Sequence, residues 1–197
     1  MQQNVINQNL LDSWKEFYSR YFNLQVELDL DIIPDYVQGY NRLIVVVPKI
    51  NPDKLIRAMR IHFTKVRTEI SDVTRIIISD ERSASEFPYA IWVKDEDNPI
   101  WSDPQDSEKA LPIGTLLECL LLPTETLLEY LLHFFKTWDE SRRTLNVETS
   151  MLCTGTKMVG GCPLLRYYPE SEELKITTFK EGDDISNCYP RSVVLRK

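Results

Sequence analysis

The sequence predicts an α+β fold: a β-α-β-β N-terminal half with an aromatic helix in front, a central helical pair, and a small antiparallel C-terminal sheet. Three observations predict it. Residues 43–47, LIVVV, are typical of a strand buried on both faces. Residues 115–138 hold leucines at helical spacing on both sides of Pro123. Residues 149–195 contain short apolar segments separated by glycine, proline and acidic turns.

The aromatic helix is expected to begin near Ser13, whose spacing to Glu16 fits a capping box. Its aromatic side chains recur every three or four residues, at Trp14, Phe17, Tyr18, Tyr21 and Phe22. Such a stripe is typical of a helix that packs on a sheet, and a partner-binding or base-stacking surface is the alternative.

A second helix is expected directly after the strand at 43–47. Asn51 can serve as its N-cap and Pro52 fits its first turn. The inner face of this helix is expected to consist of Leu55, Ile56, Met59, Phe63 and Val66. Two further strands are predicted at residues 74–79, TRIIIS, and 89–94, YAIWVK.

The central helical pair is predicted from two start signals. Thr115 and Glu118 fit a capping box for the first helix, and Pro123 suits the first turn of the second. Beyond it, residues 149–154, 164–168, 174–179 and 192–195 are expected to form the antiparallel sheet.

Length and composition favour one domain over residues 1–197. A hydrophobic content of 43% is enough to offset chain entropy. Residues 95–108 carry six carboxylates and no basic side chain, so a subdomain boundary, if there is one, is expected near 95–112. The first residues, MQQNVINQNL, lack the features of a signal peptide, and no window resembles a membrane span. We therefore expect a cytoplasmic protein without membrane contact.

A row of basic residues is the first candidate binding site. The net charge of −7 opposes indiscriminate binding to phosphate backbones. The helix after Asn51, however, is expected to carry Lys54, Arg57, Arg60, Lys65 and Arg67, which could meet an acidic partner or a nucleic acid. A solvated helix face is the alternative.

The glycine-rich segment 153–163, CTGTKMVGGCP, is the second candidate. Its backbone amides and Lys157 could approach an anion, whereas a hairpin turn between short strands is the structural alternative. An enzyme built around Lys157 and Glu173 would be a metal-dependent hydrolase or nuclease. The spacing of the two histidines and four cysteines reveals neither a catalytic set nor a zinc site, so we assign no catalytic residue, metal or cofactor.

Several segments resemble an uncharacterised bacterial protein family, in the same order along the chain: RLIVVVP, YAIWV, TLLECLLL, LCTG and the C-terminal PRSVVLRK. The resemblance spans nearly the whole chain. It implies a setting in mobile elements or defence islands, including CRISPR-associated loci, and no established activity. Where that family has an arginine in its TLLE helix this chain has Cys119, which argues against an enzyme that uses the arginine.

These observations lead to one expectation and two alternatives. We expect a non-enzymatic protein-interaction or regulatory module that binds another protein encoded in the same operon. The first alternative is a nucleic-acid-binding regulator that uses Lys54, Arg57, Arg60 and Arg67. The second is the metal-dependent hydrolase or nuclease.

Overall fold

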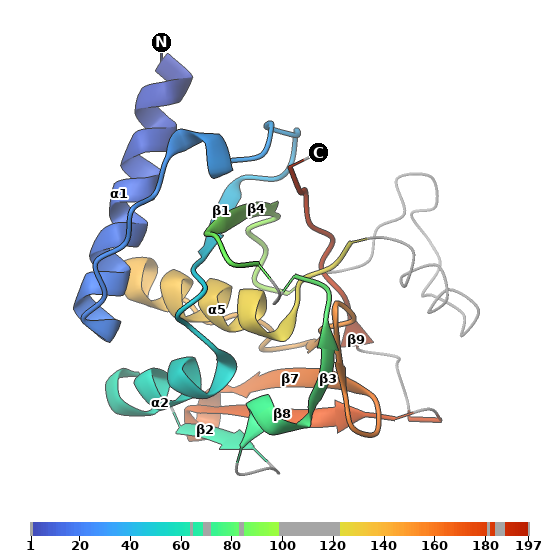
Figure 1. Ribbon diagram of the computed structural model, residues 1–197. Helices are drawn as coiled ribbons and strands as arrows, with labels where there is room; N and C mark the ends of the chain where they lie inside the picture. The colour runs from blue at the N-terminus through green and yellow to red at the C-terminus, as the bar shows by residue number, and fades with distance from the viewer. Residues whose placement is uncertain are drawn as a thin grey trace.

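The computed structural model describes residues 2–63, 65–68, 72–82, 85–98, 123–180, 182–183 and 188–196 (Figure 1). The helical elements are α1 (Gln2–Phe22), η1 (Leu30–Ile32), α2 (Pro52–His62), α3 (Val73–Ile76), α5 (Leu127–Ser141) and η3 (Pro169–Ser171). The strands are β1 (Arg42–Val46), β2 (Lys65–Thr68), β3 (Ile77–Asp80), β4 (Tyr89–Val93), β5 (Ser150–Leu152), β6 (Thr156–Met158), β7 (Cys162–Tyr168), β8 (Glu173–Phe179) and β9 (Cys188–Tyr189). The α+β class is confirmed.

Helix α5 lies at the centre of the molecule, between α1, α2 and the sheets (Figure 1). Every residue from Leu127 to Thr137 is buried. Aromatic rings fix its neighbours: Phe135 meets Phe17 of α1 at a centroid distance of 5.2 Å, and Phe63 after α2 stacks on Phe134 at 5.3 Å. The core is therefore built around one helix that is apolar on most of its circumference.

The strands that the structure describes form three sheets. β1 and β4 pair antiparallel, from Arg42 opposite Val93 to Val46 opposite Tyr89. β3 and β6 form a second antiparallel pair. The largest sheet has five strands in the order β2-β8-β7-β5-β9. The aromatic stripe of α1 packs against β1 of the β1–β4 pair, where the Trp14 and Tyr18 side chains donate hydrogen bonds to the carbonyls of Leu43 and Val45.

The predicted antiparallel C-terminal sheet is confirmed for β5, β7 and β8 and is wrong at the two edges of the sheet. β5, β7 and β8 are antiparallel, but β9 runs parallel to β5 and β2 runs parallel to β8, so the sheet is mixed. β2 comes from the N-terminal half, where the sequence predicts a longer α2. Val66 is buried between exposed Lys65 and Arg67, a strand alternation that the helical pattern concealed. Residues 192–195 form isolated bridges only.

Helix boundaries required further corrections. α1 begins at Gln2, and Ser13 lies inside it, where the Ser13 hydroxyl accepts a hydrogen bond from Lys136 instead of capping the helix. Residues 74–79 divide into the short helix α3 and the strand β3, because Asp72 caps a helical turn at Arg75 N. α5 begins at Leu127, with Thr126 and Glu129 forming its capping box, so Pro123 is not in its first turn.

One expectation for α2 is confirmed, and two others concern residues that the structure does not describe or describes only in part. The Asn51 cap of α2 is confirmed, since its side chain accepts a hydrogen bond from Lys54 N at 2.9 Å. The first helix of the central pair, with Thr115, Glu118 and Cys119, lies outside the described residues. Most of the proposed boundary at 95–112 lies there too.

Candidate binding cleft

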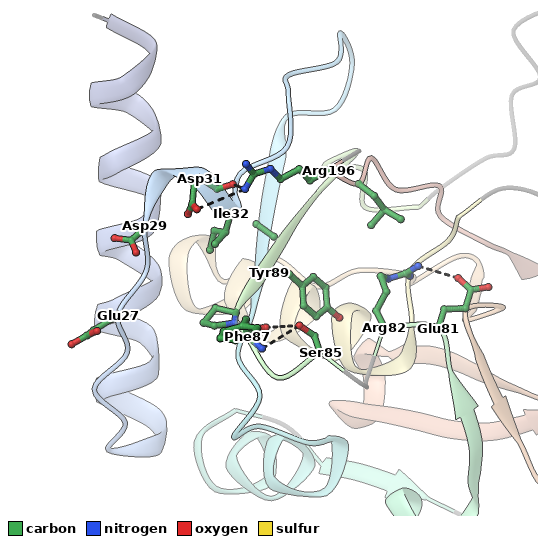
Figure 2. Close-up of a pocket in the computed structure, with 13 residues that line it drawn as sticks. Glu27, Asp29, Asp31, Ile32, Glu81, Arg82, Ser85, Phe87, Tyr89 and Arg196 are labelled. Atoms are coloured by element: carbon green, nitrogen blue, oxygen red, sulfur yellow. Dashed lines mark hydrogen bonds and ion pairs between the residues drawn. The ribbon is translucent and has the colours of Figure 1, made fainter.

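A cleft of about 680 Å³ opens between three segments that are far apart in sequence (Figure 2). One wall consists of residues 27–32, which include η1, and the opposite wall of Glu81 and Arg82 after β3. Residues 85–90, at the start of β4, form the floor, and Leu195 and Arg196 close one end. A volume of this size is in the range of sites that hold a small molecule or a few side chains of a peptide.

The floor of the cleft is apolar. Phe87 is 75% exposed, the largest such fraction among the exposed large hydrophobic side chains of the described residues. Ile32, Pro88, Ala90 and Leu195 line the same space. Exposure of a large aromatic ring in a concave surface is unfavourable in water, and a ligand that covers the ring removes this cost.

Acidic residues outnumber basic ones among those that line the cleft, and Figure 2 shows the side chains of Glu27 and Asp29 at its rim, extending away from Phe87. Glu27, Asp29, Asp31 and Glu81 line the cleft, against Arg82 and Arg196. Both arginines face carboxylates: Arg82 lies 3.0 Å from Glu81, and Arg196 lies 3.9 Å from Asp31. The carboxylates of Glu27 and Asp29 make no ion pair with any described residue, so the cleft has an excess of negative charge.

A buried ion pair holds Arg82 in place. Its Nε and Nη2 atoms donate to the two carboxylate oxygens of Glu129 at 2.6 and 2.8 Å. The Tyr89 hydroxyl and the Thr126 amide donate to the same carboxylate, at 3.0 and 2.7 Å. Arg82 also donates to the carbonyl of Thr124. This two-pronged geometry anchors the wall of the cleft on the first turn of α5.

Burial and the charge of Glu129 oppose each other at Arg82 and act in the same direction at Tyr89. Burial disfavours the guanidinium charge of Arg82, but the hydrogen bonds and charge of Glu129 outweigh it and raise the pKa of Arg82. Burial, reinforced by the charge of Glu129, raises the pKa of Tyr89 far above its ordinary value. Arg82 therefore stays charged and Tyr89 stays neutral at any physiological pH, which suits a fixed support.

A second buried polar group lies further along α5. The Nδ1 atom of His133 is 2.9 Å from Glu125 Oε1, and Arg191 Nε is 3.7 Å from Glu125 Oε2. His133 Nε2 has no hydrogen-bond partner among the residues that the structure describes. Burial lowers the pKa of His133, so the imidazole is neutral at pH 7. The orienting carboxylate of a general base is present, but His133 is completely buried and no substrate could reach it in this conformation.

The residues chosen from the sequence lie elsewhere. Lys54, Arg57 and Arg60 are on α2, and Arg67 is on β2 rather than on the same helix as expected. Lys157 is exposed on β6. None of these five lines the cleft. The hairpin alternative for residues 153–163 is confirmed, because Met158 and Gly161 pair across a tight turn between β6 and β7.

Cys153 is a free and completely buried thiol, and Cys162 is free and partly buried. Burial raises the pKa of Cys153 well above its ordinary value, which leaves that thiol protonated. Within the described ranges, no three histidine, cysteine or acidic side chains come together in a way that could hold a metal ion.

The residues of the cleft were missed because they are separated in sequence. Arg82, Tyr89 and Glu129 have no spacing in common, and only the tertiary structure brings Arg82 after β3 and Tyr89 at the start of β4 to the first turn of α5. One signal was available: Thr126 and Glu129 have the capping-box spacing that places the Glu129 carboxylate at the start of α5.

Comparison of the chain with protein-family models, with curated proteins and with solved structures gave no match in any of the three. Among the helices that the structure describes, none combines the length and the hydrophobicity needed to cross a membrane.

Proposed function

We propose that this protein is a non-enzymatic binding module. Its cleft binds a segment with basic and apolar side chains that belongs to another protein. The partner is a protein encoded in the same operon, in the mobile-element or defence setting that the sequence resemblance implies. The observation that carries the proposal is the exposed ring of Phe87 within a cleft lined by four carboxylates.

Each part of the cleft has a role in this proposal. The apolar floor around Phe87 supplies affinity, since aromatic anchors in desolvated pockets contribute most of the energy of protein interfaces. The carboxylates of Glu27 and Asp29, which have no cation opposite them in the described part of the chain, favour lysine or arginine and speed association. The fixed Arg82–Glu129 pair keeps the cleft open before binding, which reduces the entropy cost.

A quantitative pull-down with charge-reversed protein tests the proposal. The double variant Glu27→Lys/Asp29→Lys changes two exposed side chains and should leave the fold intact. We expect it to retain less than about a tenth of the partner that the wild-type protein captures from the native host, because repulsion replaces attraction at the rim. Phe87→Ala should cause a loss of similar size through the floor.

The matched control is Glu148→Lys/Glu170→Lys, which makes the same change of charge at exposed positions that do not line the cleft. It should capture the partner as the wild type does. A protein captured equally by all variants would mean that its binding site lies outside the cleft, and the proposal would then be wrong.

A further inference from the structure

Six exposed cations of this acidic protein lie on or directly before α2 and on the neighbouring strand β2. Lys54, Arg57 and Arg60 project from α2, Lys49 precedes it, and Lys65 and Arg67 follow on β2. We call these six residues the basic face. All six are exposed. α2 lies at an edge of the molecule, next to the C-terminal end of α1 (Figure 1).

The charge of the basic face is not neutralised within the described part of the chain, where none of its six residues makes an ion pair with a carboxylate. The one acidic residue of α2, Asp53, is turned away, because its carboxylate accepts hydrogen bonds from the amides of Val73 and Thr74 at 2.9 and 2.8 Å. Lys54 and Arg60 instead donate to backbone carbonyls, those of Lys49 at 2.8 Å and Val66 at 2.9 Å. These bonds position the cations and leave their charge available.

The surface is also concave and partly apolar. A hollow of about 580 Å³ is lined by Lys49, Lys54 and Arg57 together with Tyr21 and Phe22 of α1, and no carboxylate lines it. A second hollow of about 580 Å³ is lined by Arg60, His62 and Lys65 and by one acidic residue, Glu172. Ile61, which is 70% exposed, lies between the two.

We infer that the basic face binds single-stranded nucleic acid, with backbone phosphates at Lys54, Arg57 and Arg60 and bases against Ile61 and the rings that line the first hollow. Unpaired cations along a groove recognise the phosphates, and apolar or aromatic surface beside them accommodates unstacked bases. The bases of a duplex are stacked and could not use this apolar surface. Binding would be independent of sequence, because no array of polar groups is placed to recognise base edges.

Fluorescence anisotropy with labelled homopolymers of about 15 nucleotides, oligo(U) and oligo(dT), tests this inference. We expect binding at low ionic strength, with a slope of about −2 for log K against log salt concentration if three phosphates are contacted. Arg57→Ala should weaken binding several-fold, and Lys54→Ala/Arg57→Ala/Arg60→Ala should weaken it by about tenfold or more. The Arg57 side chain makes no hydrogen bond or ion pair in the described structure, so the single variant removes charge without a structural contact.

Lys180→Ala is the control for Arg57→Ala, because it removes one exposed cation outside the basic face and should leave the affinity unchanged. Absence of binding at low salt, or equal losses in the control and in the basic-face variants, would overturn the inference. Vesicles containing phosphatidylserine and a polyglutamate peptide are run in parallel. Binding of either one that depends on Arg57, without oligonucleotide binding, would overturn it in favour of a membrane or an acidic protein.

Discussion

At the scale of single residues, the Arg82–Glu129 pair is the contact that defines the cleft. The Glu129 side chain is completely buried and that of Arg82 is 11% exposed. Removal of one partner from such a pair leaves an uncompensated charge in a medium that solvates it poorly. The pair therefore fixes the position of residues 81–82 in the cleft wall, and breaking it should destabilise the folded protein.

Arg82→Met should therefore lower the free energy of unfolding by about 3–5 kcal/mol, measured by urea denaturation. The double variant Arg82→Met/Glu129→Met should recover only part of this loss: no charge is then left buried, but the Tyr89 hydroxyl and the Thr126 amide lose their acceptor. Arg75→Met is the comparison: its ion pair with Asp72 is largely exposed, and its loss should cost below about 1 kcal/mol. Equal losses for Arg82→Met and Arg75→Met would show that Glu129 is solvated.

His133 makes stability depend on pH. Burial lowers its pKa below the ordinary value of 6.5, although Glu125 opposes the shift, and Arg191 and Arg42 add to it. Below pH 6.5 the unfolded chain binds a proton that the folded protein resists, so the free energy of unfolding should fall as the pH falls through this range, by at most about 1.4 kcal/mol per pH unit.

Denaturation curves between pH 7 and pH 5 measure this dependence, and His133→Gln supplies the comparison. Glutamine can still donate a hydrogen bond to Glu125 but does not titrate, so the variant should lose this part of the pH dependence. An unchanged slope in His133→Gln would assign the dependence to other groups.

At the scale of elements, sequence patterns located most of the individual strands and helices. The LIVVV run identified β1 and YAIWV identified β4, because β-branched and aromatic side chains pack well on the pleated surface of a sheet. Asn51 and Pro52 fixed the start of α2. Sequence patterns mispredict the boundary between α2 and β2. The apolar spacing of α2 continues through Phe63 and Val66, so the pattern predicts helix where β2 lies. Pairing between distant strands sets the order of the mixed sheet, and no local pattern records it.

The β6–β7 hairpin gives a prediction at this scale. Gly161 has φ of +148°, and a Cβ added there would lie 1.8 Å from the carbonyl oxygen of Phe179 on β8. Gly161→Ala must displace that strand, and we expect a loss of about 2–4 kcal/mol in the free energy of unfolding.

Gly160→Ala separates the collision from the backbone strain. Gly160 also has a positive φ, of +90°, but a Cβ there would meet its nearest atom at 3.9 Å. The Gly160→Ala variant should lose only the free energy of unfolding that corresponds to the backbone strain, about 1 kcal/mol. Similar losses for the two variants would mean that β8 yields without cost.

At the scale of the whole molecule, the charges are segregated. A net charge of −7 is combined with a basic face on α2 and β2 and an acid-lined cleft beside η1. Composition and local patterns predicted the basic residues, because Lys54, Arg57 and Arg60 are close in sequence. The cleft could not be predicted, since its carboxylates and Phe87 come from segments that only the tertiary structure brings together.

The central claim is that the cleft binds a partner protein, and photocrosslinking from its floor tests it most directly. Benzoylphenylalanine in place of Phe87 should give one covalent adduct in the native host, and the crosslinked segment of the partner should contain lysine or arginine beside apolar residues. The same group in place of Val159, which is 62% exposed at the β6–β7 turn, should not give that adduct. An adduct with no basic segment, equal adducts from both positions, or none from Phe87 would contradict the claim.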